Sequence, residues 1–301
     1  LDAGLREKGR GEVIMPPKTS LHGPERAFCQ ALSAWLPRSG GLGVKWVTIF
    51  PANAARGLPA VGGLVVLSDG ATGRPQAILD GGVVTAWRTG ASAALAARYL
   101  ARPGVECAGL LGCGVQGRAS MGALAAELPA LRSVRCHDAV PAAAAAFAAE
   151  AADSLPGIEV VVCERPAAVT RGAGVVVTAI TMSDELAPPL GAGALGPGAL
   201  AVALDYDAAW SAAAMAECAR FYCDDTAQVL ATKAHGPRLH RIPEAIAGDL
   251  GELAAGLVAG RRDPAERLFC LNLGLAVEDI VTARLIVGRA REQGAGTVLP
   301  V

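Results

Sequence analysis

The most informative segment of the chain is a glycine-rich turn between Gly109 and Arg118. Within it, Gly112, Gly114 and Gly117 have the spacing GxGxxG, after a strand-like apolar run and at the start of a helix-like stretch. In that setting the first glycine allows a tight turn, the second lets the backbone approach a pyrophosphate, and the third lets the helix pack on the strand. The helix N-terminus then faces the phosphates. The spacing therefore predicts a dinucleotide-binding site.

An acidic residue, Asp138, follows the next strand-like run, about where a carboxylate accepts hydrogen bonds from the adenosine ribose hydroxyls. Its charge would repel a 2′-phosphate, so its position favours NAD, with NADP as the other possibility. Arg135 and His137 are nearby cations that can instead favour the phosphate of NADP. The alternative is that Asp138 only caps the following helix and the glycine turn binds nothing.

Lysine is rare in this chain, with four residues, at positions 8, 18, 45 and 233. Lys45 lies in the strand-like run from Gly43 to Phe50, on the same face as Val47 and Ile49 by simple alternation. An ammonium group there is either an edge-strand residue that reaches solvent or a desolvated amine with a lowered pKa. Alternation alone leaves both possibilities open.

Three further charged residues have positions suited to chemistry. Arg88 opens an alanine-rich helical stretch, where its guanidinium can bind a carboxylate or phosphate in a bidentate manner, or simply be a surface charge. Asp205 and Asp207 follow an apolar strand, at the place where open α/β sheets present side chains to ligands. One of the two aspartates can cap the helix expected near Trp210 while the other takes part in chemistry.

The elements that must position these residues change in character along the chain. Pro24 to Leu36 has apolar residues at helical spacing and predicts an amphipathic helix. The strand-like runs 42–50, 62–68 and 75–79, with a hairpin signal at 69–73, predict an antiparallel sheet. Helices are expected at 85–101 and 275–290.

Between these two helices, short strands alternate with helices, which is typical of a doubly wound parallel sheet. The predicted fold class is therefore α/β, a Rossmann-type sheet plus a discontinuous α+β domain. The expected strands are 107–111, 132–136, 158–162 and 174–178, and the clearest helices are 115–128 and 140–151.

Composition excludes several classes of protein. The 301 residues are 52% hydrophobic, enough for two domains, and the net charge of −1 lacks the basic excess of a nucleic-acid binder. No apolar stretch approaches the ~20 uninterrupted residues of a membrane-spanning helix. Eight scattered cysteines without a CxxC pair favour free thiols in a reducing cytoplasm over disulfides or a metal site. We therefore expect a cytoplasmic protein without metal, membrane or nucleic-acid partners.

An ordered set of motifs resembles the ornithine cyclodeaminase/mu-crystallin family, from about residue 11 to the C-terminus. The resemblance implies a homodimer that binds NAD(P) and a small amino, imino or keto acid. It implies a substrate and dimerisation domain from residues 1–101 and 275–301, and a Rossmann domain from residues 102–274. The motifs are Lys45, Gly57-Leu58-Pro59, Thr72-Gly73-Arg74-Pro75, the run Thr85 to Ala91, the turn Gly112 to Gln116, and the run Gly274 to Asp279.

The resemblance also implies roles for individual residues. Lys45 and Arg88 match substrate-contacting residues, Asn272 falls near the expected nicotinamide end, and Asp207 matches the catalytic aspartate, with Asp205 as the second candidate. The positions that match dinucleotide-lining residues are Thr89, Gly112, Gly114, Val115 and Gln116.

Two departures from the family pattern bear on the activity. Lys18 stands where the family commonly has a carboxylate-binding arginine, so it supplies charge without the bidentate geometry. Asp207 is followed by Ala208-Ala209-Trp210-Ser211 instead of the Pro-Gly-Lys-like stretch of the cyclising deaminases. These departures favour an imino- or keto-acid reductase, or an amino-acid dehydrogenase, over ornithine cyclisation. A non-catalytic ligand-binding protein is the third possibility.

In the favoured mechanism, Arg88 and Lys18 anchor the substrate carboxylate and place the α-carbon against the nicotinamide. Reduction needs a protonated imine nitrogen, and either Asp207 or Lys45 would supply that proton as general acid. In the cyclodeaminase alternative, NAD is used catalytically and ammonia leaves without net redox change.

Overall fold

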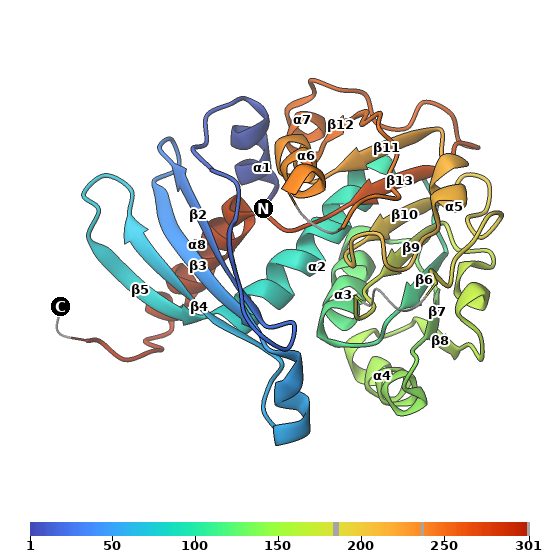
Figure 1. The fold of residues 1–301 in the computed structure, drawn as a ribbon, viewed down its shortest axis with the longest axis horizontal. Helices are drawn as coiled ribbons and strands as arrows, with labels where there is room; N and C mark the ends of the chain where they lie inside the picture. The colour runs from blue at the N-terminus through green and yellow to red at the C-terminus, as the bar shows by residue number, and fades with distance from the viewer. Residues whose placement is uncertain (183–186, 236–237, 300–301) are drawn as a thin grey trace. The chain divides into compact units, whose positions relative to one another are not determined.

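A computed structural model describes residues 1–182, 187–235 and 238–299 of the protein (Figure 1). The chain divides into two compact units. Unit 1 comprises Leu1, Ala3–Arg88 and Leu275–Val301, and unit 2 comprises Asp2 and Thr89–Gly274. The chain therefore leaves unit 1 once and returns to it. No helix within the described ranges is both long enough and apolar enough to span a bilayer.

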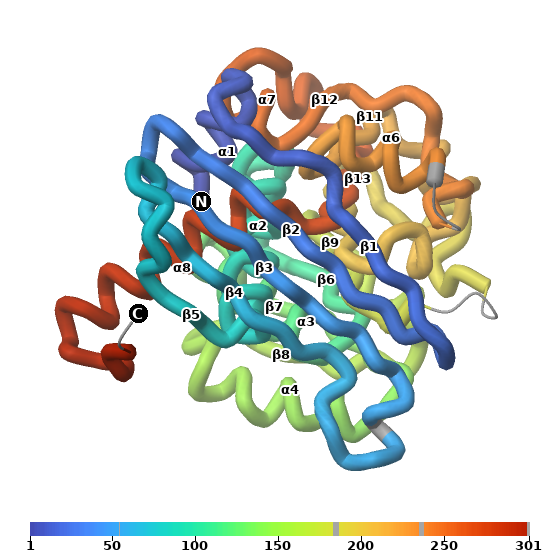
Figure 2. Tube along the Cα trace, turned by 60° about the vertical axis from the view of Figure 1, so that its left-hand side comes forward, coloured from blue at the N-terminus to red at the C-terminus, as the bar shows by residue number. Residues whose placement is uncertain are grey.

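Unit 1 is built on an antiparallel sheet of five strands, whose order in space follows their order in the sequence. Helix α8 (Ala276–Glu292) contacts the three central strands and runs across one face of the sheet (Figure 2). The short helices α1 (Asp2–Gly9) and η1 (Pro51–Arg56) complete the elements before α2. The strands are β1 (Thr19–His22), β2 (Phe28–Leu36), β3 (Gly41–Ile49), β4 (Val61–Asp69) and β5 (Pro75–Asp80).

The helix expected at Pro24 to Leu36 is wrong, because Phe28–Leu36 forms strand β2. The second half of β2 alternates strictly, with Leu32, Ala34 and Leu36 buried and the residues between them exposed. All nine residues of β2 pair with β3. The apolar positions matched a helical period by coincidence, and pairing with the neighbouring strand decided the conformation.

Two glycines of β3 determine how closely α8 packs on the sheet. A Cβ added at Gly43 would lie 2.7 Å from Ile280 Cδ1 and 2.4 Å from the Val66 carbonyl oxygen. A Cβ at Gly41 would lie 3.0 Å from Ile280 Cγ2. Side chains alternate along a strand, so Lys45 shares this face with both glycines. The missing side chains bring the first turn of α8 close to Lys45.

Unit 2 contains an eight-stranded sheet in the order β12-β11-β13-β10-β9-β6-β7-β8, and all neighbouring strands in it are parallel. The chain builds outward from β6 in one direction and then in the other, so the order reverses between β6 and β9, as in a doubly wound sheet. The expected fold class is confirmed. The strands are β6 (Cys107–Leu111), β7 (Ser133–His137), β8 (Glu159–Val162), β9 (Val175–Thr178), β10 (Leu200–Ala203), β11 (Arg220–Cys223), β12 (Gly248–Asp249) and β13 (Leu268–Leu271).

Helices connect these strands, and the division between the units falls inside the first of them, α2 (Gly81–Leu100). A Cβ added at Gly90 of α2 would lie 2.5 Å from the carbonyl oxygen of Ala119, so α2 packs closely on α3. The other helices are α3 (Val115–Glu127), α4 (Pro141–Ser154), η2 (Pro166–Thr170), α5 (Ala212–Ala216), α6 (Thr226–His235) and α7 (Leu250–Ala255).

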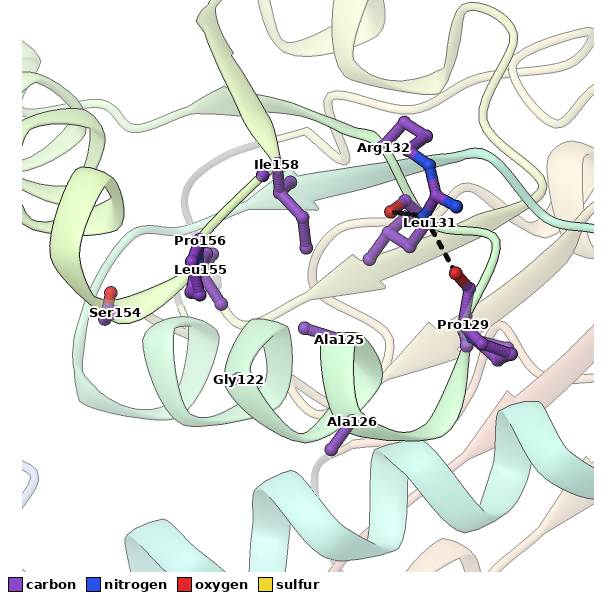
Figure 3. Close-up of a pocket in the computed structure, with 12 residues that line it drawn as sticks. Gly122, Ala125, Ala126, Pro129, Leu131, Arg132, Ser154, Leu155, Pro156 and Ile158 are labelled. Atoms are coloured by element: carbon purple, nitrogen blue, oxygen red, sulfur yellow. Dashed lines mark hydrogen bonds between the residues drawn. The ribbon is translucent and has the colours of Figure 1, made fainter.

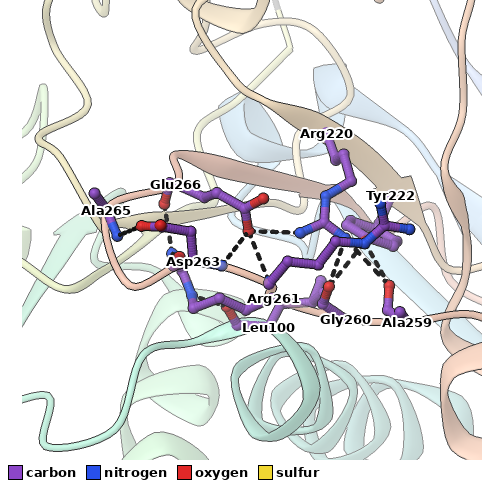
Figure 4. Close-up of polar contacts among 10 residues, drawn as sticks. Leu100, Arg220, Tyr222, Ala259, Gly260, Arg261, Asp263, Ala265 and Glu266 are labelled. Atoms are coloured by element: carbon purple, nitrogen blue, oxygen red, sulfur yellow. Dashed lines mark hydrogen bonds and ion pairs between the residues drawn. The ribbon is translucent and has the colours of Figure 1, made fainter.

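A polar network fixes the loop that precedes β13 (Figure 4). Arg220 of β11 pairs with Glu266 at 2.5 Å, and Tyr222 donates a hydrogen bond to the carbonyl oxygen of Ala259. Arg261 donates from Nε to the carbonyl oxygen of Leu100, the last residue of α2. This loop is therefore tied both to the sheet and to the C-terminal end of α2.

Candidate active site

Unit 1 buries a cluster of four charged side chains around Lys45. Lys45 is 1% exposed, and its Nζ lies 2.7 Å from Asp279 Oδ1 and 3.2 Å from Thr85 Oγ1. Arg88 Nη1 lies 3.2 Å from Glu278 Oε2, and Arg88 Nε lies 3.2 Å from Asp279 Oδ1. Two buried cations are thus matched by two buried carboxylates, which is the condition under which charges remain inside a protein.

The electrostatics of the cluster place the Lys45 amine near the range of working pH. Burial lowers the pKa of Lys45 from 10.5 to about 8, and the Arg88 charge acts in the same direction. The Asp279 carboxylate opposes both by its charge and by its hydrogen bond. Of the two interpretations that alternation left open, the structure therefore matches the desolvated amine. An amine with such a pKa can hold a proton and release it near neutrality.

Lys18 lies within electrostatic range of the cluster, since its charge is one of the causes that lower the pKa of Lys45. It is half-buried and directly precedes β1. Lys18, Lys45 and Arg88, which the sequence assigned to substrate contact, therefore belong to one electrostatic environment in unit 1. A ligand carboxylate is the group that such a concentration of cations suits.

Glu278 and Asp279 were not predicted as site residues, although both lie in a motif that supported the family resemblance. They occupy the first turn of α8 and are fully buried. Glu278 Oε1 and Asp279 Oδ2 make no hydrogen bond within the part of the chain that the structure describes. The available signal was two adjacent carboxylates at the start of a helix whose neighbouring residues are apolar.

In unit 2 the glycine turn has the geometry that its spacing predicted. Gly112 has a φ of +97°, and a Cβ there would lie 2.4 Å from the carbonyl oxygen of Ala179. A Cβ at Gly117 would lie 2.1 Å from the Gly112 carbonyl oxygen. A Cβ at Gly114, by contrast, would meet nothing within 4 Å. Two glycines are thus required by the fold itself, whereas Gly114 leaves open space at the N-terminus of α3.

Asp138 links the glycine turn to the next helix. Its Oδ2 accepts a hydrogen bond from the Cys113 N–H at 2.7 Å, and its Oδ1 accepts one from the Val140 N–H at 2.8 Å. The nearby cations are engaged elsewhere, because Arg135 Nε donates to the Ala168 carbonyl oxygen and His137 Nδ1 lies 2.8 Å from the Cys163 carbonyl oxygen. At the end of β7, Asp138 therefore holds two backbone N–H groups, and Arg135 and His137 each contact a backbone carbonyl oxygen.

Two other residues of unit 2 that were predicted to bind the cofactor have a buried polar atom without a hydrogen bond among the described residues. Thr89 Oγ1 and Gln116 Oε1 are buried and make no hydrogen bond among the described residues. Val115 is exposed, and Asn272 is buried with its Nδ2 donating to Ser92 Oγ at 3.0 Å. Buried polar atoms without partners normally receive one from a ligand or water. Together with the open space at Gly114, these atoms fit a bound dinucleotide.

The structure separates the two candidate aspartates. Both oxygens of Asp205 accept hydrogen bonds, from Thr178 Oγ1 at 2.9 Å and from the Ile180 N–H at 3.0 Å. Trp210 Nε1 in turn donates to Thr178 Oγ1. Burial raises the pKa of the Asp205 carboxyl to about 7. Asp205 therefore joins the ends of β9 and β10.

Asp207, two residues further on, is held by Arg241. The Arg241 N–H lies 3.4 Å from Asp207 Oδ2, and the Arg241 Nη1 lies 3.9 Å from the same oxygen. The intervening Tyr206 has a φ of +60°, which turns the chain between the two aspartates. Asp207 belongs to unit 2, whereas Lys45 and Arg88 belong to unit 1.

A cavity of about 540 Å³ lies elsewhere in unit 2, beside the C-terminal half of α3 (Figure 3). Its one charged wall residue is Arg132, whose Nη1 donates to the carbonyl oxygens of Pro129 and Leu131. None of the predicted site residues lines this cavity. We therefore assign it no part in the chemistry.

The sequence profile of the ornithine cyclodeaminase/mu-crystallin family matches residues 1–294. The Δ1-pyrroline-2-carboxylate reductase of Thermococcus litoralis, solved with NADH and L-proline, is 28% identical with a TM-score of 0.89, and the match covers 99% of this chain and 93% of that one. An archaeal alanine dehydrogenase dimer with bound NAD is 27% identical with a TM-score of 0.85, covering 99% and 92%. A lysine cyclodeaminase is 29% identical with a TM-score of 0.86, covering 100% and 87%.

Proposed function

The chain belongs to the ornithine cyclodeaminase/mu-crystallin family, as its motifs predicted, and we propose that it is an NAD(H)-dependent reductase of imino or keto acids, or an amino-acid dehydrogenase in the reverse direction. The observation that carries this proposal is the buried cluster of unit 1, in which Lys45 and Arg88 face Glu278 and Asp279. Relatives of this fold include NAD(H)-binding reductases and dehydrogenases that act on amino acids and imines. These relatives support the reaction class and leave the substrate to be identified.

We assign Arg88 and Lys18 to the substrate carboxylate. A guanidinium has five N–H donors in a fixed plane and binds a carboxylate in a bidentate manner, which fixes the orientation of the substrate. Lys18 adds charge without that geometry. Holding the reacting carbon in one orientation accounts for several kcal/mol of the barrier in reactions of this kind.

Lys45 and Asp207 are the candidates for handling the proton. Imine reduction requires a proton on the imine nitrogen, and an acid with a pKa near the working pH supplies it best. The pKa of Lys45, lowered by burial to about 8, meets that requirement. Asp207, whose carboxylate is held by Arg241, is the second candidate for this role.

The dinucleotide is assigned to Thr89, Gly112, Gly114, Val115, Gln116, Asp138 and Asn272 of unit 2. When bound, NAD accepts or donates the hydride exchanged at the substrate α-carbon. Asp138 would accept hydrogen bonds from the adenosine ribose hydroxyls, and its charge favours NAD over NADP. The engagement of Arg135 and His137 with backbone carbonyl groups supports the same preference.

We further propose a homodimer formed through the face of the unit 1 sheet that points away from α8. Trp46, Leu64 and Ile78 lie on this face and are 41%, 52% and 61% exposed. Trp46 is paired with Leu64 across β3 and β4, so their side chains are neighbours. An apolar face of this kind marks an association surface.

The reaction is tested by a substrate screen that follows NADH absorbance. The panel contains cyclic imino acids and 2-oxo acids, the latter with and without ammonia or methylamine. Oxidation of NADH that depends on an imine supports the proposal. Ammonia release from ornithine or lysine with catalytic NAD, and without accumulation of NADH, would instead identify a cyclodeaminase. Binding of ligand and cofactor without either reaction would identify a non-catalytic protein.

A further inference from the structure

We propose that Asp279 is a positioning residue, which keeps Lys45 protonated and holds the Lys45 and Arg88 side chains together. Its catalytic meaning rests on the proposed function, in which Lys45 supplies a proton and Arg88 binds the substrate carboxylate. The assignment of Asp279 itself rests on contacts within unit 1.

One oxygen of Asp279 serves both cations. Asp279 Oδ1 lies 2.7 Å from Lys45 Nζ and 3.2 Å from Arg88 Nε. Both cations are nearly excluded from solvent, so water does little to weaken their mutual repulsion. A single carboxylate oxygen near both of them adds two attractions that oppose this repulsion. Without it, the ammonium and the guanidinium would separate or the Lys45 ammonium would lose its proton.

The groups that face Lys45 come from three parts of unit 1. Arg88 and Thr85 come from α2, Asp279 comes from α8, and Lys18 comes from the segment before β1. Burial, Arg88 and Lys18 lower the pKa of Lys45, and Asp279 is the group that raises it. Asp279 is therefore the charged group that opposes burial, Arg88 and Lys18.

The position of Asp279 in α8 suits a carboxylate. It lies in the first turn, where the N-terminal end of a helix favours negative charge. The Asp279 N–H donates to the carbonyl oxygen of Leu275, so the backbone there is helical. The charge is thus stabilised from its own helix as well as by the two cations.

The neighbouring residue Glu278 provides a matched control. It has the same charge, the same burial and the same helical turn as Asp279. The Glu278 carboxylate accepts hydrogen bonds from Arg88 Nη1 and from the Leu275 N–H, and neither contact involves Lys45. Loss of the Glu278 charge should therefore disturb Arg88 far more than it disturbs Lys45.

The experiment measures the protonation of Lys45 directly, by NMR of protein labelled with 13C at the lysine ε-carbon. The chain has four lysines, and Lys45→Met identifies the Lys45 signal. In the parent chain we expect a midpoint of about 8. In Asp279→Asn the midpoint should fall to about 7 or lower, because the attractive charge is gone. In Glu278→Gln it should stay close to the parent value.

Two results would overturn the assignment: an unchanged midpoint in Asp279→Asn, or an equal fall in Glu278→Gln. Cooperative thermal unfolding of each variant establishes that it is folded. Should Asp279→Asn fail to fold, Asp279→Glu replaces it. That variant retains the charge, so a midpoint near 8 supports the assignment and a midpoint below about 7 contradicts it.

The NMR titration needs no turnover, so it tests the role of Asp279 even when no substrate is reduced. Where activity is found, the alkaline limb of the kcat/KM profile should move to lower pH in Asp279→Asn, in step with the NMR midpoint. A midpoint that moves while the alkaline limb stays fixed confirms the action of Asp279 on Lys45. The same result removes Lys45 as the proton donor of the proposed function.

Discussion

The carboxylate of Asp138 accepts a hydrogen bond from the backbone N–H of Cys113, inside the glycine turn, at a distance of 2.7 Å. The same carboxylate binds the N–H of Val140, next to the start of α4. A residue proposed to select the cofactor therefore also helps to shape the turn that would hold the pyrophosphate. Substitutions at this position must distinguish the charge from the hydrogen bonds.

Asp138→Asn removes the charge and keeps one acceptor oxygen, so it can retain one of the two backbone hydrogen bonds. We expect the preference for NADH over NADPH to fall by about tenfold, or about 1.4 kcal/mol. Asp138→Ser, which is shorter, should relax the preference as well and weaken both cofactors. The measurement is kcat/KM for each cofactor. An unchanged ratio in both variants would remove Asp138 from ribose recognition.

Alanine at Gly114 and alanine at Gly112 should have opposite consequences. Gly114 has open space around its missing side chain, so Gly114→Ala should keep the thermal stability and weaken NADH binding, by about tenfold or more. Gly112 has a positive φ and a carbonyl oxygen in the way, so Gly112→Ala should lower the unfolding free energy by about 1–3 kcal/mol or more. Calorimetric melting and NADH titration measure the two effects. NADH affinity equal to the parent value in Gly114→Ala would argue against the assigned phosphate position.

Lys45→Met should abolish turnover and leave the cofactor bound. Removal of a general acid typically lowers kcat by about 10²–10⁴-fold. The NADH dissociation constant should change little, since Lys45 is not among the residues assigned to the dinucleotide. Fluorescence titration with NADH and steady-state kinetics provide the two readouts. A kcat close to that of the parent would exclude Lys45 from the mechanism.

Asp205 should make the stability depend on pH between about 4 and 7. The pKa of its carboxyl is raised by burial from 3.8 to about 7, so in this range the folded state holds a proton that the unfolded state has released. The contribution is fully present below pH 3.8 and is lost as the pH rises through 7, by up to about 4 kcal/mol of unfolding free energy. Urea unfolding at several pH values should show this decline in the parent and not in Asp205→Asn. If the unfolding free energies of the parent and of Asp205→Asn changed with pH in the same way, Asp205 would not be the source of the decline.

Trp46→Glu should dissociate the proposed homodimer. A charge in the centre of the exposed apolar face would have to be buried in the interface, at a cost of several kcal/mol. Sedimentation equilibrium measures the molar mass of the variant and of the parent. Trp87→Glu is the control, because Trp87 is a highly exposed tryptophan of α2 and does not belong to the sheet. A parent chain that sediments as a monomer would disprove the dimer.

Much of the fold followed from local patterns in the sequence. The hairpin signal at 69–73 connects β4 and β5, and the alternating strands and helices of unit 2 occur close to the expected positions. These elements could be predicted because the turn glycines and the lengths of the apolar runs lie in the local sequence. The helix predicted at 24–36 was wrong because the apolar spacing there fits both a helix and a strand. Only the pairing with β3 decides between these two conformations.

The site was less accessible to sequence reasoning, because its partners are distant in the chain. Lys45 and Asp279 are separated by 234 positions, and no sequence pattern around Lys45 indicates that Asp279 is its counter-ion. Alternation placed Lys45 on a strand face and left its burial undecided. Likewise, sequence spacing could not separate Asp205 from Asp207, since their difference lies in the hydrogen bonds from Thr178 and Ile180.

The geometry of the charged cluster around Lys45 depends on Gly43, a residue outside the cluster. The residue carries no charge, yet its lack of a methyl group allows Ile280, the residue after Asp279, to approach the sheet. Alanine at this position would push back the helix that carries the counter-ion of Lys45. A substitution that alters only the packing would then change the pKa of Lys45, two residues further along the same strand.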